Sequence, residues 1–194
     1  KEILRVELGI IVGDDTLGQY TGSPVPEIMS HFAPPERIPE LTHAWMKYKV
    51  HYIDKFELYP GIVEVLDRLK TAGLKIAVVT SQSKRESVVT REFMGLDDYF
   101  DAWIGSDQVK AVKPNPEPVL LALKTLGVAP DHTMMVGDTF NDLEAGRKAG
   151  TYIAAVLWGF GEKDILYTYK PEFVFKEVSE LNVLSQLAEK KHST

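Results

Sequence analysis

Short apolar strands alternate with amphipathic helices from Tyr59 to the C-terminus, and this alternation restricts the fold more than any other feature. Strands are predicted in 74–80, 101–105, 132–138, 151–159 and 172–175. Helices are predicted in 60–73, 84–95, 117–127, 141–150 and 178–191. Such alternation is typical of βαβ units and a parallel sheet, so an α/β, Rossmann-like fold is expected. Ligands of these sheets bind beyond the carboxyl ends of the strands.

Residues 1–56 have a different pattern. They are polar, and apolar residues recur every three or four positions at Ile38, Leu41, Trp45 and Tyr48, as on one face of a helix. Prolines stand where helices begin or loops turn. The sequence therefore predicts a small helical domain over 1–56 and an α/β core over 57–194.

Residues suited to phosphate chemistry follow three of the predicted elements. Thr80 and Ser81 end a strand, and their hydroxyls can donate hydrogen bonds to phosphoryl oxygens. Lys113 lies just before a helix, where its ammonium can offset a dianion. Asp138 ends a strand, and Asp142 falls in the first turn of the next helix, so the pair forms an oxygen site suited to Mg²⁺.

Each of these residues also has a purely structural interpretation. Thr80 can be a turn residue, Lys113 a solvated loop lysine, and the Gly-Asp-Thr segment at 137–139 a helix cap. Their occurrence together, in chain order on successive elements of one sheet, favours the functional interpretation.

The segments "VVTSQ", "KPNPEP" and "VGDTFNDLEAGRKAG" resemble, in this order, motifs II, III and IV of the haloacid dehalogenase superfamily. The resemblance implies a Mg²⁺-dependent phosphohydrolase that acts on a small phosphorylated metabolite through an aspartyl-phosphate. "AAVLWGFG" is similar to the phosphoglycolate phosphatase and pyrophosphatase branch, and residues 1–56 resemble the family's small helical cap.

The resemblance also assigns roles to individual residues. Thr80 is expected to bind a phosphoryl oxygen, and Lys113 to balance the charge of nucleophile and phosphoryl group. Asp138 is expected to ligate Mg²⁺, with Asp142 orienting it. Weaker candidates for substrate contact are Ser81, Gln82, Tyr20 and Gly22.

The segment "GIIVGDDTLG" imitates the family's motif I, D-x-D-G-T-L, but it does not match it. The alignment puts Val12 at the nucleophile, and valine cannot attack phosphorus. Asp14 and Asp15 are expected instead to cap a helix. In the family, the motif I strand lies between the strands that end here at Thr80 and Asp138. We therefore expect an upstream segment of about 20–25 residues to supply it.

Composition excludes several other classes of protein. The net charge of −6 disfavours binding to nucleic acid or to an anionic membrane surface, and no apolar run is long enough to span a bilayer. The absence of cysteine excludes disulfides and thiolate chemistry and suits a cytoplasmic protein. A monomer or homodimer is expected. A phosphomutase, a dehalogenase, and a non-catalytic binding protein lacking the nucleophile remain alternatives.

Overall fold

The computed structural model describes residues 1–192, with side chains up to residue 188. Its α/β region contains five short parallel strands, and the connections between successive strands contain helices, as the alternation predicts. The strands are β1 (Ala77–Val79), β2 (Ala102–Ile104), β3 (Met134–Gly137), β4 (Tyr152–Val156) and β5 (Phe173–Phe175). The helices are α5 (Ile62–Thr71), α6 (Lys84–Met94), α7 (Glu117–Leu126), α8 (Phe140–Ala149), α9 (Lys163–Thr168) and α10 (Val183–His192). The predicted α/β class is confirmed.

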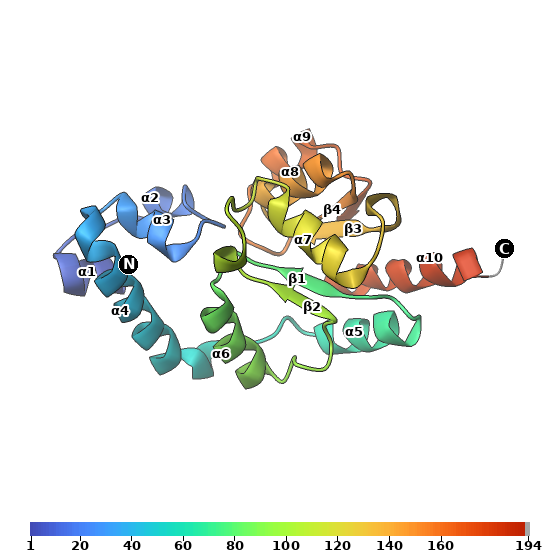
Figure 1. Cartoon of the computed structure of the whole chain (residues 1–194), viewed down its shortest axis with the longest axis horizontal. Coiled ribbons are helices and arrows are strands. Elements are labelled where there is room, and N and C mark those ends of the chain that lie inside the picture. Colours follow the sequence, from blue (N-terminus) through green and yellow to red (C-terminus); the bar gives the residue numbers. More distant parts are fainter. Residues whose placement is uncertain (193–194) are drawn as a thin grey trace.

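The strands form two sheets rather than one. β1 pairs with β2, and β3, β4 and β5 pair in that order. Val79 of the first sheet and Met135 of the second pack against the same cluster of α7 and α8 side chains, so the two sheets lie against shared helices (Figure 1). The split falls between the strands that end near Thr80 and Asp138.

The facing edges of the two sheets carry peptide groups that the ladders do not use. Thr80 N–H donates to the Ile104 carbonyl at 2.9 Å. Because peptide groups alternate between the two sides of a parallel strand, those of Ala77 and Val79 point away from β2. By the same alternation, Met134 and Val136 point away from β4. Both edges thus present donors and acceptors to an extended segment.

The strands beside the split are also less buried than β4. Residues Ile153–Ala155 of β4 are fully buried, at 0% exposure, between two helical layers. α5 and the C-terminal elements cover one face, while α8 and α9 cover the other. The residues of β1, and Met134–Val136 of β3, are only half-buried. The strands that border the split are therefore less covered than β4.

Residues 1–56 contain only helices and turns, and they lie beside the α/β region (Figure 1). The helices are α1 (Glu2–Leu8), α2 (Asp14–Gly18), α3 (Val25–Ser30) and α4 (Ile38–His51). They enclose a hydrophobic cluster of their own: Ile3, Leu4, Val25, Met29 and Leu41. Ile10 and Val12 of "GIIVG" pack against this cluster and form no strand.

Three local expectations need correction. Gly13 is the N-cap of α2, whereas Asp14 and Asp15 occupy its first turn, where their charge favours the helix dipole. The predicted C-terminal helix is a 3₁₀ turn (Val178–Asn182) followed by α10. Helix α9 was not predicted, because its six residues are too few to show a clear period.

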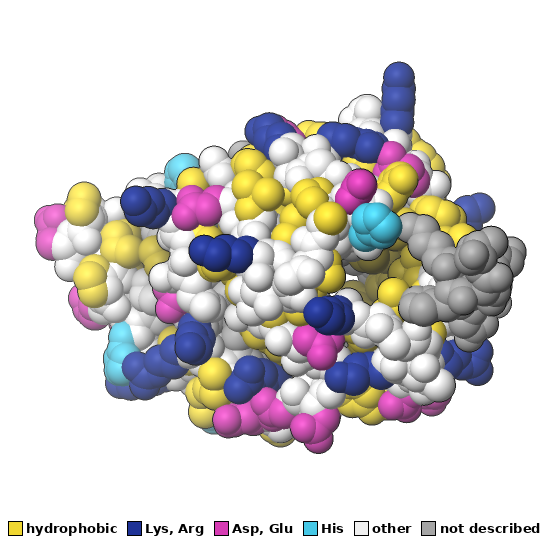
Figure 2. Space-filling model, turned by 45° about the vertical axis from the view of Figure 1, so that its right-hand side comes forward, with side chains coloured by type: hydrophobic (Ala, Val, Ile, Leu, Met, Phe, Trp, Pro, Cys, Tyr) yellow, Lys and Arg dark blue, Asp and Glu magenta, His cyan; other side chains and the backbone are white. Residues whose placement is uncertain are grey.

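On the face drawn in Figure 2, acidic and basic side chains are interspersed, and hydrophobic side chains are visible inside a hollow. Among residues 1–192, no helix combines the length and apolarity required to cross a bilayer.

We expect Leu41→Ala to destabilise the helical region. Leu41 is 0% exposed at the centre of its cluster, and truncation of such a leucine costs about 2–5 kcal/mol. In the Leu41→Ala variant, amide hydrogen exchange should accelerate more in residues 1–55 than in β3 and β4. Ile11→Ala is the control, because Ile11 is 88% exposed and should change stability by about 0.5 kcal/mol at most. Equal effects of the two variants would contradict a separate helical core.

Candidate active site

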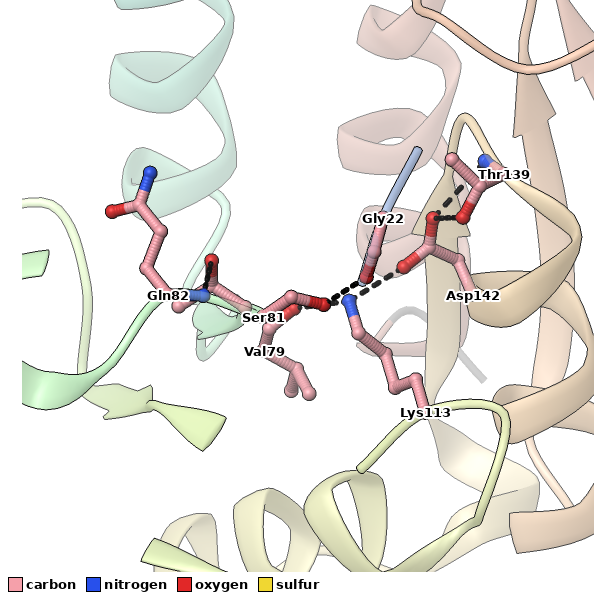
Figure 3. Close-up of polar contacts among 8 residues, drawn as sticks. Gly22, Val79, Ser81, Gln82, Lys113, Thr139 and Asp142 are labelled. Carbon is pink, nitrogen blue, oxygen red and sulfur yellow. Dashed lines mark hydrogen bonds and ion pairs between the residues drawn. The ribbon is translucent and has the colours of Figure 1, made fainter. Parts of the chain in front are cut away.

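Lys113 links the carboxyl end of β1 to the first turn of α8. Its Nζ donates to the Val79 carbonyl at 2.7 Å and to Asp142 Oδ1 at 2.6 Å (Figure 3). The Val79 carbonyl belongs to the free edge of β1, so the ammonium satisfies an acceptor that a neighbouring strand does not reach. The side chains of Lys113 and Asp142 are each only 9% exposed. The lysine is thus a buried bridge and not a solvated loop residue.

Asp142 is held at both of its oxygens. Oδ1 accepts from Lys113, and Oδ2 accepts from the Thr139 N–H at 3.0 Å and from Thr139 Oγ1 at 2.6 Å. Thr139 and Asp142 form a capping box at the start of α8. The capping interpretation is therefore correct for Asp142, and the same carboxylate also fixes Lys113.

Asp138 directly follows β3, and its carboxylate is positioned by the loop after β4. Its Oδ2 accepts from the Phe160 N–H at 2.8 Å. A Cβ placed on Gly159 would lie 2.2 Å from this oxygen, so the loop can approach Asp138 only because this residue is glycine. No protein donor contacts Asp138 Oδ1 within the described part of the chain. This oxygen is available to an external cation.

Thr80, Ser81 and Gln82 follow β1, but their side chains diverge. Thr80 Oγ1 accepts from the Gln82 N–H at 3.2 Å, and its own proton remains free to donate. Ser81 Oγ donates to the Gly22 carbonyl. The Gln82 side chain points away from Lys113 toward α6, where its Oε1 accepts from Thr90 Oγ1 at 3.4 Å. The structure therefore turns Ser81 toward the helical region and the Gln82 side chain toward α6, while the Thr80 hydroxyl stays at the end of β1.

The helical region reaches this site through Gly22. This residue has φ +87°, and a Cβ on it would lie 3.1 Å from Asn141 Nδ2. The backbone of the "YTGSP" turn thus touches both the β1 end and the start of α8. Tyr20 does not share this position, because its ring stacks on His31 at 4.4 Å and meets Phe32 edge-on within the helical region.

The donor set fits a single hard cation of the Mg²⁺ type. Within the described residues there is no group of three or more His, Cys, Asp or Glu side chains that could hold a metal. Mg²⁺ commonly needs only one or two carboxylates and takes its remaining ligands from water and substrate phosphate. Asp138, with one uncommitted oxygen, fits a direct ligand; Asp142, which is fully engaged, fits an orienting role.

A pocket of about 200 Å³ lies where the helical region meets the end of β1. It is lined by Ser23, Val25, Ile28, Trp45, Lys49, Phe56, Thr80, Ser81, Gln82 and Glu86. Both regions contribute walls, so a small molecule bound at Thr80 would also contact the helical region.

Sequence reasoning anticipated the helix cap that Thr139 provides and missed two other contributors, the Phe160 N–H and Lys49. Thr139 follows Asp138 and precedes the helical acid by three residues, which is the spacing of a capping box. The Phe160 N–H and the pocket residue Lys49 carried no such signal, because their roles depend on contacts between distant segments.

Lys113→Met tests the buried bridge. It leaves the Asp142 charge buried without its cation, and the loss of one partner of such a pair costs about 3–5 kcal/mol of unfolding free energy. The double variant Lys113→Met/Asp142→Asn removes both charges and should recover most of that loss. Urea unfolding measures both. If the single variant kept wild-type stability, the pair would not be a buried bridge.

The chain is similar in sequence to known proteins. The family model of the haloacid dehalogenase-like hydrolases matches residues 2–156. The chain is 33% identical over 148 residues to the pyrophosphatase PpaX of Halalkalibacterium halodurans, covering 76% of this chain and 69% of that protein. It is 36% identical over 131 residues to PpaX of Bacillus cereus, covering 68% of this chain and 61% of the relative.

Solved structures share the fold. The β-phosphoglucomutase of Clostridium difficile superposes with a TM-score of 0.82 at 20% identity, covering 97% of this chain and 87% of that one. A predicted phosphoglycolate phosphatase from Haemophilus somnus gives 0.81 at 19% identity, covering 95% and 87%. The resemblance drawn from the motifs is confirmed, and the chain belongs to the haloacid dehalogenase-like hydrolase family.

Proposed function

We propose that this protein is a Mg²⁺-dependent phosphohydrolase of a small phosphorylated metabolite. The observation that carries the proposal is the position of Lys113, whose ammonium contacts the end of β1 and the start of α8. Thr80 directly follows β1, and Asp138 directly follows β3. A phosphoryl group bound between them meets a hydroxyl donor, a fixed positive charge and a carboxylate able to hold a cation.

Each of these groups has a part in the chemistry. The Thr80 hydroxyl donates to a phosphoryl oxygen, and the Lys113 ammonium offsets the charge of the phosphoryl group and its nucleophile. Asp138 Oδ1 would hold Mg²⁺, which when bound neutralises charge on the transferring phosphoryl group. Asp142 keeps Lys113 in place. Such positioning and charge neutralisation provide most of the catalysis in phosphoryl transfer.

The split between β1 and β3 is where the nucleophile is proposed to lie. We infer that an extended segment pairs with both free edges and presents an aspartate at the carboxyl end of the sheet; none of residues 1–192 occupies that position. A carboxylate oxygen of this aspartate attacks phosphorus as the bond to the leaving oxygen breaks, and that oxygen takes up a proton. Water then hydrolyses the aspartyl-phosphate and releases inorganic phosphate.

The helical region fits the role of a cap. Its Gly22 carbonyl accepts from Ser81, and its side chains complete the pocket beside Thr80. Closure over a bound phosphoryl group would exclude bulk water from the first step and limit the substrate to small molecules. The sequence relatives are named pyrophosphatases, and one structural neighbour is named a predicted phosphoglycolate phosphatase. Both names denote enzymes that hydrolyse small phosphorylated compounds.

Phosphomutase activity is the second candidate, supported by the fold shared with β-phosphoglucomutase. The two activities differ in the acceptor of the phosphoryl group, which is water in one and a sugar hydroxyl in the other. We favour hydrolysis because the relatives above 30% identity carry the name pyrophosphatase.

Asp138→Asn should weaken Mg²⁺ binding and leave the fold intact. The amide oxygen can still accept from the Phe160 N–H, but the negative charge that attracts the cation is lost. We expect the affinity for Mg²⁺, measured by calorimetry, to fall at least about tenfold, and hydrolysis of phosphorylated metabolites to fall about a hundredfold.

Asp131→Asn is the matched control, because Asp131 is exposed in a turn (Pro130–His132) before β3. It should change neither Mg²⁺ affinity nor activity. Wild-type Mg²⁺ affinity in Asp138→Asn would remove Asp138 from the metal site. Wild-type hydrolysis that persists in EDTA would refute the metal dependence.

A further inference from the structure

Lys49 is a buried cation at the boundary between the helical region and the α/β region. It lies near the C-terminal end of α4 and is 7% exposed. Its Nζ donates to the backbone carbonyl of Glu86, on α6, at 3.2 Å. An ammonium has three donors, and this bond uses one of them.

No carboxylate neutralises Lys49 directly. Its nearest acid, Glu86, uses Oε2 to accept from the Ser83 N–H at 2.7 Å and Oε1 to accept from Trp45 Nε1 at 3.1 Å. Among the side chains described up to residue 188, none forms an ion pair with Lys49. Burial lowers the pKa of Lys49, and the more distant Glu86 charge opposes that shift. A buried cation without a paired anion is costly unless a ligand supplies one.

Lys49 also lines the pocket that contains Thr80 and Ser81. Thr80 belongs to the α/β region and Lys49 to the helical region, so they stand on walls contributed by different parts of the chain. The rest of the lining is mostly apolar or uncharged: Ser23, Val25, Ile28, Trp45, Phe56 and Gln82. Glu86 also lines the pocket, and both of its carboxylate oxygens are engaged by Trp45 and Ser83. A ligand whose phosphoryl group reaches Thr80 therefore extends into a small space whose one buried cation is Lys49, within the described residues.

We propose that Lys49 binds a second anionic group of the substrate and thereby selects small phosphoryl compounds that carry one, either a carboxylate or a further phosphate. This inference depends on the proposed function, which puts the transferring phosphoryl group beside Thr80. An anion from the ligand completes the coordination of the Lys49 ammonium and removes the cost of its unpaired charge. Phosphate esters with an uncharged organic part leave that cost in place.

A purely structural lysine would behave differently. In that case the bond to the Glu86 carbonyl only ties α4 to α6, and removal of the ammonium lowers stability without changing the order of ligand affinities. The preference among ligands, and not stability or total activity, is therefore the informative quantity.

The experiment measures binding by calorimetry in the presence of Mg²⁺ with three probes: 2-phosphoglycolate, pyrophosphate and ethyl phosphate. The first two carry a second anionic group, a carboxylate and a phosphate respectively, and ethyl phosphate carries none. Each probe is titrated into the wild type, Lys49→Met and Lys47→Met. Lys47 lies on the same helix but is exposed, so its variant controls for the general loss of one positive charge.

We expect the wild type and Lys47→Met to bind at least one doubly anionic probe about tenfold or more tightly than ethyl phosphate. Lys49→Met should lose that preference while its affinity for ethyl phosphate stays within about twofold. Loss for 2-phosphoglycolate alone identifies a carboxylate as the second anion, and loss for pyrophosphate alone identifies a phosphate. If Lys49→Met does not fold, Lys49→Gln, which keeps a donor without the charge, must show the same loss of preference.

Two results overturn the inference in distinguishable ways. If the wild type binds all three probes equally, or Lys49→Met keeps the preference, the role of Lys49 is refuted and the phosphoryl site stands. If the wild type binds none of them, the proposed function and the inference fail together.

Discussion

The buried contact of Lys113 with Asp142 and the Val79 carbonyl is the interaction on which the site depends. One ammonium satisfies an edge carbonyl of β1 and the carboxylate that caps α8. Both side chains are nearly excluded from solvent, so the pair is maintained only because Thr139 donates to the remaining oxygen of Asp142. The same network also fixes a positive charge between the end of β1 and the start of α8.

The second constraint is the split sheet. β4 is fully buried between helical layers, whereas β1 and β3 are half-covered and turn unused peptide groups toward the gap between them. Unpaired strand edges of this kind accept an extended segment readily. The proposed nucleophile fits that position, since every other group of the site already lies at the carboxyl ends of the strands on either side. The helical region contacts the site through Gly22 and contributes Lys49 to the neighbouring pocket.

The sequence predicted the parts of the structure that depend on local pattern. The period of the apolar residues located β1 to β5 and most of the helices, and the motifs identified Lys113, Asp138 and Asp142 as candidates. It could not show that Lys113 links β1 to α8 or that the Phe160 N–H holds Asp138, because these contacts join segments far apart in the chain. It also could not show that the Gln82 side chain turns toward Thr90, because a pattern of residue types does not fix a side-chain rotamer. Asp14 and Asp15 show the converse, since a motif-like pattern there forms an ordinary first turn of a helix.

The central claim is that the ends of β1 and β3 and the Lys113 loop form one phosphoryl site. Titration of the protein with inorganic phosphate and Mg²⁺, followed by backbone amide chemical shifts, tests it most directly. We expect saturable shifts confined to Thr80, Ser81, Lys113, the segment 138–142 and the Gly22 turn, with residues 183–188 of α10 unaffected. Saturable shifts located elsewhere, or none at millimolar phosphate, would contradict it.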